Sequence, residues 1–332
     1  MMFQRCAALS ILIAATLFYI ESTPAEALPA TAKDYRGLGF VVVSPNAPED
    51  GGDFGPNTPS TKTAGLQEAI NHAREIQRDV YIVGGGAKEA FKNPVVYTMT
   101  ETLRIPWMQD FRLDSGNAVI QYNGQGEAIV FDSQMSCSYR FGLVVSAAHA
   151  PVVRLAPQSK GPDNFSVITA CKFEFVAIVG AGSVFSGEGA TGRGTGLWFD
   201  AAQGPIDGNE FHLTEIIACE TGIRMDEGST NNWIRCPFLH LCNTHLVIGQ
   251  PGSTRARLNR IEAFIDGAGI PENSGVLVHG QHNQLNLSFG STADKRNLVL
   301  APGATQNLVS LLNLPNGLTD ESGGKNRISA PE

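Results

Sequence analysis

The sequence predicts an all-β fold in which short parallel strands stack as the rungs of a solenoid, and three observations carry this prediction. Glycine contributes 36 of 332 residues and charged residues only 17 %, a composition that argues against disorder and against a coiled coil. A short polar–apolar motif recurs along most of the chain, and a second short apolar strand follows most copies. Repeats of this length with Gly and Asn at the turns are typical of β-solenoids.

The first 27 residues have the pattern of a secretory signal peptide. One positive charge precedes the apolar run Cys6–Ile20, which is shorter than a membrane span, and Ala25-Glu26-Ala27 has the small-x-small form of a cleavage site. We therefore expect cleavage near Ala27 and a secreted, extracellular or periplasmic protein; an uncleaved anchor is the alternative. Residues 28–60 would form an N-terminal extension. No later stretch is apolar enough for stable membrane insertion.

One helix is expected over residues 64–76, at the start of the solenoid. Its apolar residues recur at helical spacing: Leu66, Ala69, Ile70, Ala73 and Ile76. Thr61 or Thr63 would cap its N-terminus. Short strands are expected next, over residues 80–83, 95–97 and 103–105.

The repeated motif starts with Asn or Cys and places apolar residues two and four positions later. Its copies begin at Gln109, Cys137, Cys171, Asn209, Asn232, Asn259, Asn283 and Asn307, at spacings of 28, 34, 38, 23, 27, 24 and 24 residues. Spacings in the twenties predict one rung per copy, about eight rungs in all, and the longer spacings indicate loop insertions. Stacked rungs lie about 4.8 Å apart, so like residues form columns. The first inward column would run from Phe111 through Tyr139, Phe173 and Phe211, and the asparagines would form a hydrogen-bonded ladder.

Five cysteines remain after the signal peptide, and an odd number cannot all pair within the chain. None has the tight CxxC spacing of a zinc site. Cys219 and Cys242 share a column, which permits a disulfide, but we prefer stacked buried thiols.

Together, the helix at 64–76, the strand at 80–83, the segment 103–106 and rungs such as 209–225 resemble the pectate-lyase-like superfamily. The resemblance covers roughly residues 53–313. It implies a single-stranded right-handed parallel β-helix, which we place at residues 61–313, followed by a polar, disordered tail at 314–332. Members of the superfamily include polysaccharide lyases, glycoside hydrolases, epimerases, phage tailspikes and non-catalytic surface proteins, and trimers are common. A bound calcium ion is implied only by the resemblance. No aspartate cluster of that kind is seen, so no cofactor and no metal ligands are assigned.

Residues alternate in and out along a strand, so the outward face of the first strand in each rung can be predicted. The central outward column is Arg112, Arg140, Glu174, His212, Arg235, Glu262, Asn286 and Ser310. The column two residues earlier is Asp110, Ser138, Lys172, Glu210, Trp233, Arg260, Gln284 and Leu308. This charged strip suits an acidic polysaccharide lying across the rungs, because Trp can stack on a sugar ring and Arg or Lys can bind a uronate. An ordinary solvated sheet face is the alternative.

The leading expectation for this strip is a polysaccharide lyase that acts by β-elimination. His212 would be the base, Glu174 would orient it, and Arg235 or Arg140 would neutralise the substrate carboxylate. Further substrate contacts would come from Lys172, Glu210, Trp233, Arg260 and Glu262. The alternatives are an inverting glycoside hydrolase using Glu174 and Glu210, about 8 Å apart, and a non-catalytic glycan-binding or structural protein. Glu262 lies about 14 Å from Glu174, too far for a hydrolase pair.

The second strand of each rung has a different outward column. It is largely apolar and comprises Val130, Arg154, Trp198, Arg224, Val247, Leu277 and Val299. Apolar outward positions need a cover, so we expect a loop or a homo-oligomer, for example a trimer. His240, His245 and His279 share no metal-site spacing and are expected to be structural. The glycine-rich segment 187–192 is expected to be a flexible loop. The polysaccharide is the expected partner, and the formal charge of −8 without a basic run argues against nucleic acid.

Overall fold

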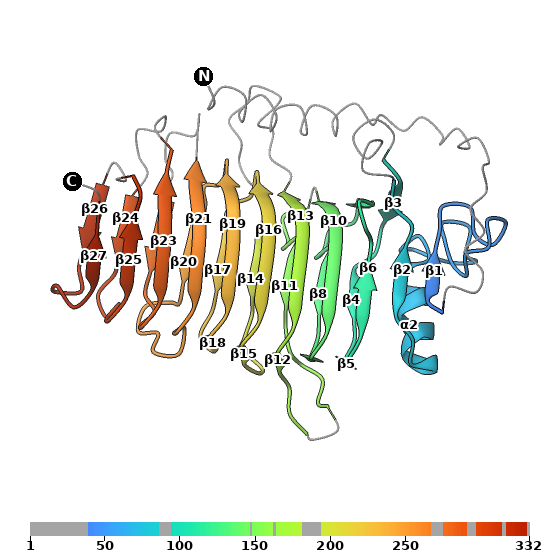
Figure 1. Ribbon diagram of the computed structural model, residues 1–332, viewed down its shortest axis with the longest axis horizontal. Coiled ribbons are helices and arrows are strands. Elements are labelled where there is room, and N and C mark those ends of the chain that lie inside the picture. Colours follow the sequence, from blue (N-terminus) through green and yellow to red (C-terminus); the bar gives the residue numbers. More distant parts are fainter. Residues whose placement is uncertain are drawn as a thin grey trace.

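The computed structural model describes residues 39–85, 94–146, 148–161, 164–180, 194–266, 275–290, 297–313 and 317–330. The expected signal peptide and the glycine-rich segment 187–192 lie outside these ranges. Within them, parallel strands stack in three sheets, of which the two larger run most of the length of the molecule and the third covers its middle part (Figure 1). This arrangement is a solenoid and is compatible with a parallel β-helix. No helix of the described ranges is long and apolar enough to cross a membrane.

The largest sheet, which we call sheet A, has thirteen strands. These are β1 (Val41–Val43), β2 (Val80–Ile82), β3 (Val96–Met99), β6 (Arg112–Asp114), β7 (Val119–Tyr122), β10 (Ser138–Ser146), β13 (Lys172–Gly180), β16 (Glu210–Ile217), β19 (Trp233–His240), β21 (Arg260–Asp266), β23 (Gln284–Phe289), β25 (Leu308–Leu311) and β27 (Arg327–Ser329).

Sheet B has nine strands and sheet C has five. Sheet B comprises β4 (Leu103–Ile105), β8 (Ile129–Phe131), β11 (Val153–Leu155), β14 (Thr195–Phe199), β17 (Thr221–Met225), β20 (Thr244–Ile248), β22 (Gly275–Val278), β24 (Asn297–Leu300) and β26 (Gly317–Asp320). Sheet C comprises β5 (Met108–Gln109), β9 (Gln134–Met135), β12 (Ile168–Thr169), β15 (Ile206–Asp207) and β18 (Ser229–Thr230). In the middle of the molecule the chain passes through sheets C, A and B in turn, so one circuit is one rung.

The predicted stacking of like residues is confirmed in the core. Phe173 is paired in register with Tyr139 on one side and with Phe211 on the other. The rings of Phe173 and Phe211 are parallel, with centroids 4.6 Å apart. All three side chains are fully buried, and burying one aromatic side chain of this size stabilises the fold by about 1.5–3 kcal/mol.

The first rung differs from the prediction by two residues. Tyr139 pairs with Leu113, not with Phe111. The reason is the left-handed residue that precedes the motif in each rung: Asp110 has φ 51°, as Ser136 has φ 55° before Cys137. Phe111 therefore occupies the position that Asn or Cys takes in later rungs, and every outward residue of this rung moves with it.

The asparagine ladder is present and buried. Asn232 shows the pattern: its Nδ2 donates to Asn259 Oδ1 (3.1 Å) and to the Ile206 carbonyl (2.9 Å), while its Oδ1 accepts from the Asn209 backbone N–H (3.2 Å). The same contacts continue to Asn326, one rung beyond the predicted end. Each amide therefore satisfies turn groups that would otherwise be buried without partners.

The end of the chain corrects the prediction of a disordered tail. The strands β26 and β27 pair with β24 and β25 and form a further rung, in which Ile328 packs on the core. The sequence does carry the motif here, since Asn326 is followed by Ile328 and Ala330 at the two apolar positions, but this copy lies in a segment that is otherwise polar.

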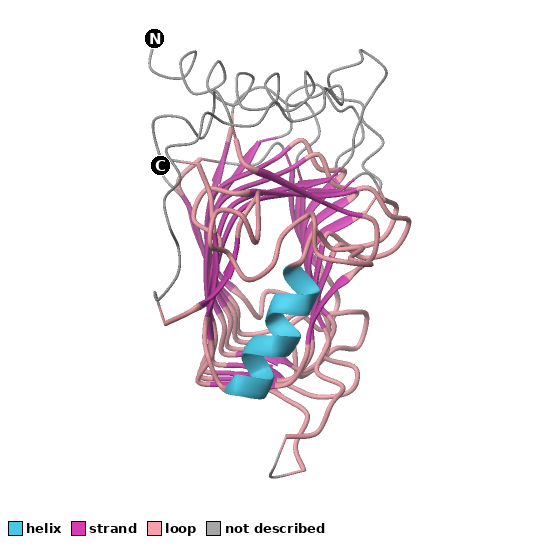
Figure 2. Ribbon diagram, turned by 90° about the vertical axis from the view of Figure 1, so that its right-hand side faces the viewer, coloured by secondary structure: helices cyan, strands magenta, loops and turns pink. Residues whose placement is uncertain are grey.

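The one helix of the described ranges, α2 (Leu66–Ile76), closes the N-terminal end of the solenoid. Figure 2 shows it lying across the space between the strand walls. The N-cap residue is Gly65, so neither predicted threonine occupies that position. Both threonines still bond to the start of the helix: Thr63 Oγ1 accepts from the Gln67 N–H (3.1 Å) and Thr61 Oγ1 from the Gly65 N–H (2.8 Å).

All five described cysteines are free and buried, as expected. Cys137 and Cys171 stack in the ladder, and the Cys137 N–H donates to Cys171 Sγ at 3.4 Å. A hydrogen bond with the Cys171 thiol lowers the pKa of Cys137 to about 7. The same contact raises the pKa of Cys171.

Candidate functional site

The two outward columns of sheet A have the predicted register from the second rung onward. The central column reads Asp114, Arg140, Glu174, His212, Arg235, Glu262, Asn286 and Ser310. The neighbouring column reads Arg112, Ser138, Lys172, Glu210, Trp233, Arg260, Gln284 and Leu308. Asp114, which the sequence reasoning missed, therefore flanks Arg140. The sequence offers no signal that would have placed it, because Phe111 stands where later rungs have Asn or Cys.

Four predicted site residues line one groove on this face. Arg140, Glu174, His212 and Arg235 come from β10, β13, β16 and β19 and surround a hollow of about 350 Å³. Its remaining lining comes from the adjoining stretches of the same four strands, among them Pro237. We call this hollow the sheet A groove. Its size is at the lower end of small-molecule sites.

The groove lies where the long strands lose their alternation. In β13 the outward and inward positions alternate up to Ala177, but the next residue, Ile178, is also buried. In the first rung the same span is two separate strands, because β10 pairs with β6 before this point and with β7 after it. The groove residues therefore lie just before this break in alternation, at equivalent positions in successive rungs.

Glu174 does not make the contact that was expected of it. Its carboxylate pairs with Lys172 Nζ at 2.5 Å and with Arg140 Nε at 4.0 Å. The imidazole Nε2 of His212 instead faces the Glu210 carboxylate at 3.5 Å. Since Glu174 has two cations within reach, its charge is already compensated. Glu210 is therefore the carboxylate positioned to orient His212.

Trp233 lies at the centre of the cationic part of the strip. Its ring contacts the edge of His212 (centroids 6.0 Å apart), and the guanidinium groups of Arg235 and Arg260 lie 5.7 and 5.1 Å from its centroid. These contacts hold the indole by cation–π attraction. The indole N–H is buried and has no hydrogen-bond partner within the described part of the chain.

Glu262 links the two arginines beside Trp233. It pairs with Arg235 at 3.4 Å and with Arg260 at 2.6 Å. Both arginine side chains are about half exposed, so these ion pairs are screened and contribute little to stability. The guanidinium groups are therefore available to an incoming anion.

The strip is locally more basic than the molecule. Over its first six rungs it carries five cations, Arg112, Arg140, Lys172, Arg235 and Arg260. It carries four carboxylates there, those of Asp114, Glu174, Glu210 and Glu262. The difference of one positive charge contrasts with the formal charge of −8 for the whole chain.

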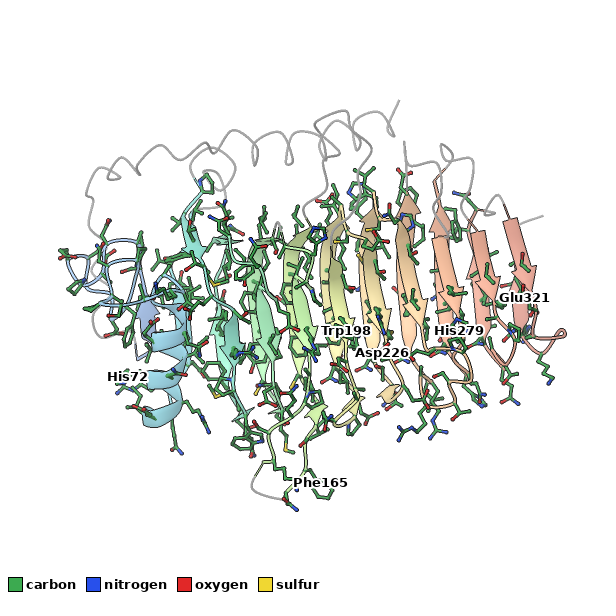
Figure 3. The ribbon with its side chains drawn as sticks, turned by 180° about the vertical axis from the view of Figure 1, so that it is seen from behind. His72, Phe165, Trp198, Asp226, His279 and Glu321 are labelled. Atoms are coloured by element: carbon green, nitrogen blue, oxygen red, sulfur yellow. The ribbon has the colours of Figure 1, made fainter. Side chains whose placement is uncertain are left out.

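The outward column of sheet B also has the predicted register, but part of it is covered within the chain. Trp198 lies between Arg154 and Arg224, each guanidinium 4.9 Å from its centroid, and its N–H donates to Asp226 Oδ2 at 2.7 Å (Figure 3). Further along the sheet, Val247, Leu277 and Val299 remain partly exposed.

The other histidines are held by structural contacts. His240 Nε2 lies 2.5 Å from Glu215 Oε1 in a buried pair, and His245 Nε2 lies 3.1 Å from the Asp266 carbonyl oxygen. Burial lowers the pKa of His279. In the described ranges, no group of three or more His, Cys, Asp or Glu side chains is arranged to hold a metal ion.

Comparison of the chain with family models, with curated proteins and with solved structures found no match. The fold and the site therefore stand on the register, the contacts and the charges described above.

Proposed function

We propose that the protein is a secreted carbohydrate-active enzyme that cleaves an acidic polysaccharide by β-elimination. One observation carries the proposal: Arg140, Glu174, His212 and Arg235, from four strands, line a single groove. A histidine in the same groove as two arginines combines an imidazole that can accept a proton with groups that bind carboxylates.

The substrate would lie along the rungs of sheet A. Arg235 or Arg140 would bind a uronate carboxylate, and Trp233 would stack on a neighbouring sugar ring. Lys172, Arg260 and the carboxylates of Glu210 and Glu262 would contact the flanking units. The exposed ion pairs of this strip support the proposal because they exchange partners at little cost.

In the elimination step each of these residues has one role. His212 removes the proton on the carbon next to the carboxylate. The electron pair of that bond forms a carbon–carbon double bond, and the bond to the glycosidic oxygen breaks. The leaving oxygen takes a proton from water, and the hydroxide so formed takes the proton held by His212. Arg235 or Arg140 stabilises the negative charge that develops on the carboxylate, and Glu210 positions His212.

The same proposal includes the finer features of the fold. A right-handed path of the chain follows from the general preference of parallel crossover connections for that hand. We propose that the chain is a right-handed parallel β-helix of the pectate-lyase-like kind, which reaches its substrate outside the cell.

Glycan binding without turnover is the second candidate, and one observation favours it. Each of the four carboxylates in the strip lies within 4.0 Å of a cationic or histidine side chain. Such compensated carboxylates serve recognition better than acid catalysis. The same observation weighs against the inverting hydrolase, which needs one protonated carboxyl group among Glu174 and Glu210.

A panel of uronic-acid and sulfated polysaccharides tests the proposal. Elimination produces an unsaturated uronate that absorbs in the ultraviolet, whereas hydrolysis produces reducing ends without this absorbance. We expect the absorbance to rise with at least one uronic-acid polymer. Reducing ends alone would favour the hydrolase, and saturable binding without either product would favour the binding protein.

A further inference from the structure

A second hollow lies at the N-terminal end of the molecule, away from the sheet A groove. It has a volume of about 440 Å³ and separates the C-terminal end of α2 from β5 and the turn that follows it. We call it the cap groove. It shares no lining residue with the sheet A groove, so what it binds is independent of the function proposed above.

The cap groove has an apolar floor and rigid walls. Ala73, Met108 and Phe111 line it and are buried. One wall is held by the Arg78 N–H, which donates to the Ala73 carbonyl at 2.9 Å. The opposite wall, which ends at Phe111, is joined to the first by the Arg112 N–H, which donates to Asp79 Oδ1 at 2.9 Å. A preformed concave site with an apolar base is typical of ligand pockets of this volume.

Trp107 gives the groove an aromatic wall. Its ring is packed against the backbone of Gly161, where an added Cβ would lie 2.5 Å from the indole nitrogen. Gly161 does not line the groove, so the ring is supported from outside and presents its remaining surface to the hollow. A rigid, supported indole is a platform for the apolar face of a flat ring.

The polar rim is balanced in charge. Arg74 and Arg78 come from α2 and the turn after it, and Asp79 and Asp110 complete the four charged groups of the lining. Neither arginine has an ion-pair partner among the described residues. Planar guanidinium and carboxylate groups form paired hydrogen bonds with adjacent hydroxyls. A rim without net charge selects an uncharged ligand over an anion.

We propose that the cap groove binds one or two units of an uncharged oligosaccharide. A pyranose ring would lie against Trp107, with its hydroxyls on Arg78, Asp79 and Asp110. The sheet A groove carries an excess of positive charge, whereas the cap groove does not, so the two sites differ in the class of sugar they take.

The test is isothermal titration calorimetry of the full mature chain with tetrasaccharides of β-1,4-glucose, α-1,4-glucose, β-1,4-xylose and N-acetylglucosamine, and with tetragalacturonate as the charged comparison. At least one uncharged probe should bind at a single site. Trp107→Ala should weaken that binding by at least about tenfold. Trp233→Ala, which removes the ring that contacts His212 and Arg235 beside the sheet A groove, should leave it unchanged.

Arg78→Ala, at an exposed position, keeps the test decisive if Trp107→Ala does not fold, as circular dichroism would show. It should also weaken binding of the uncharged probe. The proposal is overturned if no uncharged probe binds. It is equally overturned if Trp233→Ala abolishes the binding while Arg78→Ala does not, or if tetragalacturonate is the ligand that depends on Arg78.

Discussion

The rings of Phe173 and Phe211 lie face to face across neighbouring rungs, with centroids 4.6 Å apart and planes inclined by only 4°. Phe211 also meets Phe199 of sheet B edge-on at 4.8 Å. This ring therefore joins two rungs of sheet A to the opposite wall, and the register of the whole charged strip depends on such contacts.

Phe211→Ala should destabilise the protein by about 3–5 kcal/mol, because it removes a fully buried ring and leaves a cavity between packed aromatics. Urea unfolding followed by circular dichroism measures the change. Phe165→Ala is the matched control: its side chain is 70 % exposed, so stability should change by no more than about 0.5 kcal/mol. Equal effects of both variants would contradict the stacking.

Asn259→Ala should cost about 1–3 kcal/mol for each buried group it leaves without a partner. Asn259 Oδ1 accepts from both the backbone N–H and the Nδ2 of Asn232, at 3.1 Å each. Asn286→Ala, on the outward face of the same region, removes an equal number of atoms without breaking the ladder. Should the two variants unfold at the same urea concentration, the ladder would not be a stabilising element.

The free energy of unfolding should decrease as the pH falls below about 6.5, the ordinary pKa of histidine, and His279 should contribute to this decrease. Burial lowers the pKa of this side chain from 6.5, and its Nδ1 is buried without a hydrogen-bond partner within the described ranges. The unfolded chain therefore binds the proton more tightly, and stability is lost as pH falls from 6.5 toward the lower pKa of the folded state.

His279→Gln should reduce this dependence. The difference in melting temperature between pH 7.5 and pH 5.5 should be smaller in the variant than in the parent protein. His72→Gln, on the exposed face of α2, serves as the control and should keep the full difference. An unchanged difference in His279→Gln would contradict this role.

The protein should associate through the partly exposed apolar part of sheet B. Val247, Leu277 and Val299 stand next to one another on three successive rungs, and contiguous apolar surface of this kind marks contact sites. Size-exclusion chromatography with light scattering should give the mass of an oligomer, a trimer by our expectation, and Leu277→Lys should shift it to the monomer. A monomeric parent protein would remove this prediction.

Much of the fold could be predicted because one kind of side chain occupies each column. Phe, Tyr, Ile and Leu recur at the inward position, and Asn recurs at the turn. The first rung could not be placed because Phe111 stands where later rungs have Asn or Cys, and the left-handed turn at Asp110 is not visible in the sequence. The last rung was missed because its copy of the motif, Asn326 with Ile328 and Ala330, lies in an otherwise polar segment.

The site was predictable in position but not in pairing. Register alone brings Arg140, Glu174, His212 and Arg235 together, since each occupies the same outward column. The ion pairs that Glu174 forms depend on the conformations of its own and the neighbouring side chains. Lys172 lies two residues away on the same strand and His212 directly across, so the alternation of the strand could not decide between them.

The central claim is that His212 acts as a base on an acidic polysaccharide held in the sheet A groove. The most direct measurement is the rate at which ultraviolet-absorbing unsaturated uronate forms with the parent protein, with His212→Ala and with His72→Ala as a control. The account predicts a loss of at least about a hundredfold in His212→Ala alone, the effect of removing one positioned base. A His212→Ala protein that forms the product at the parent rate would contradict it.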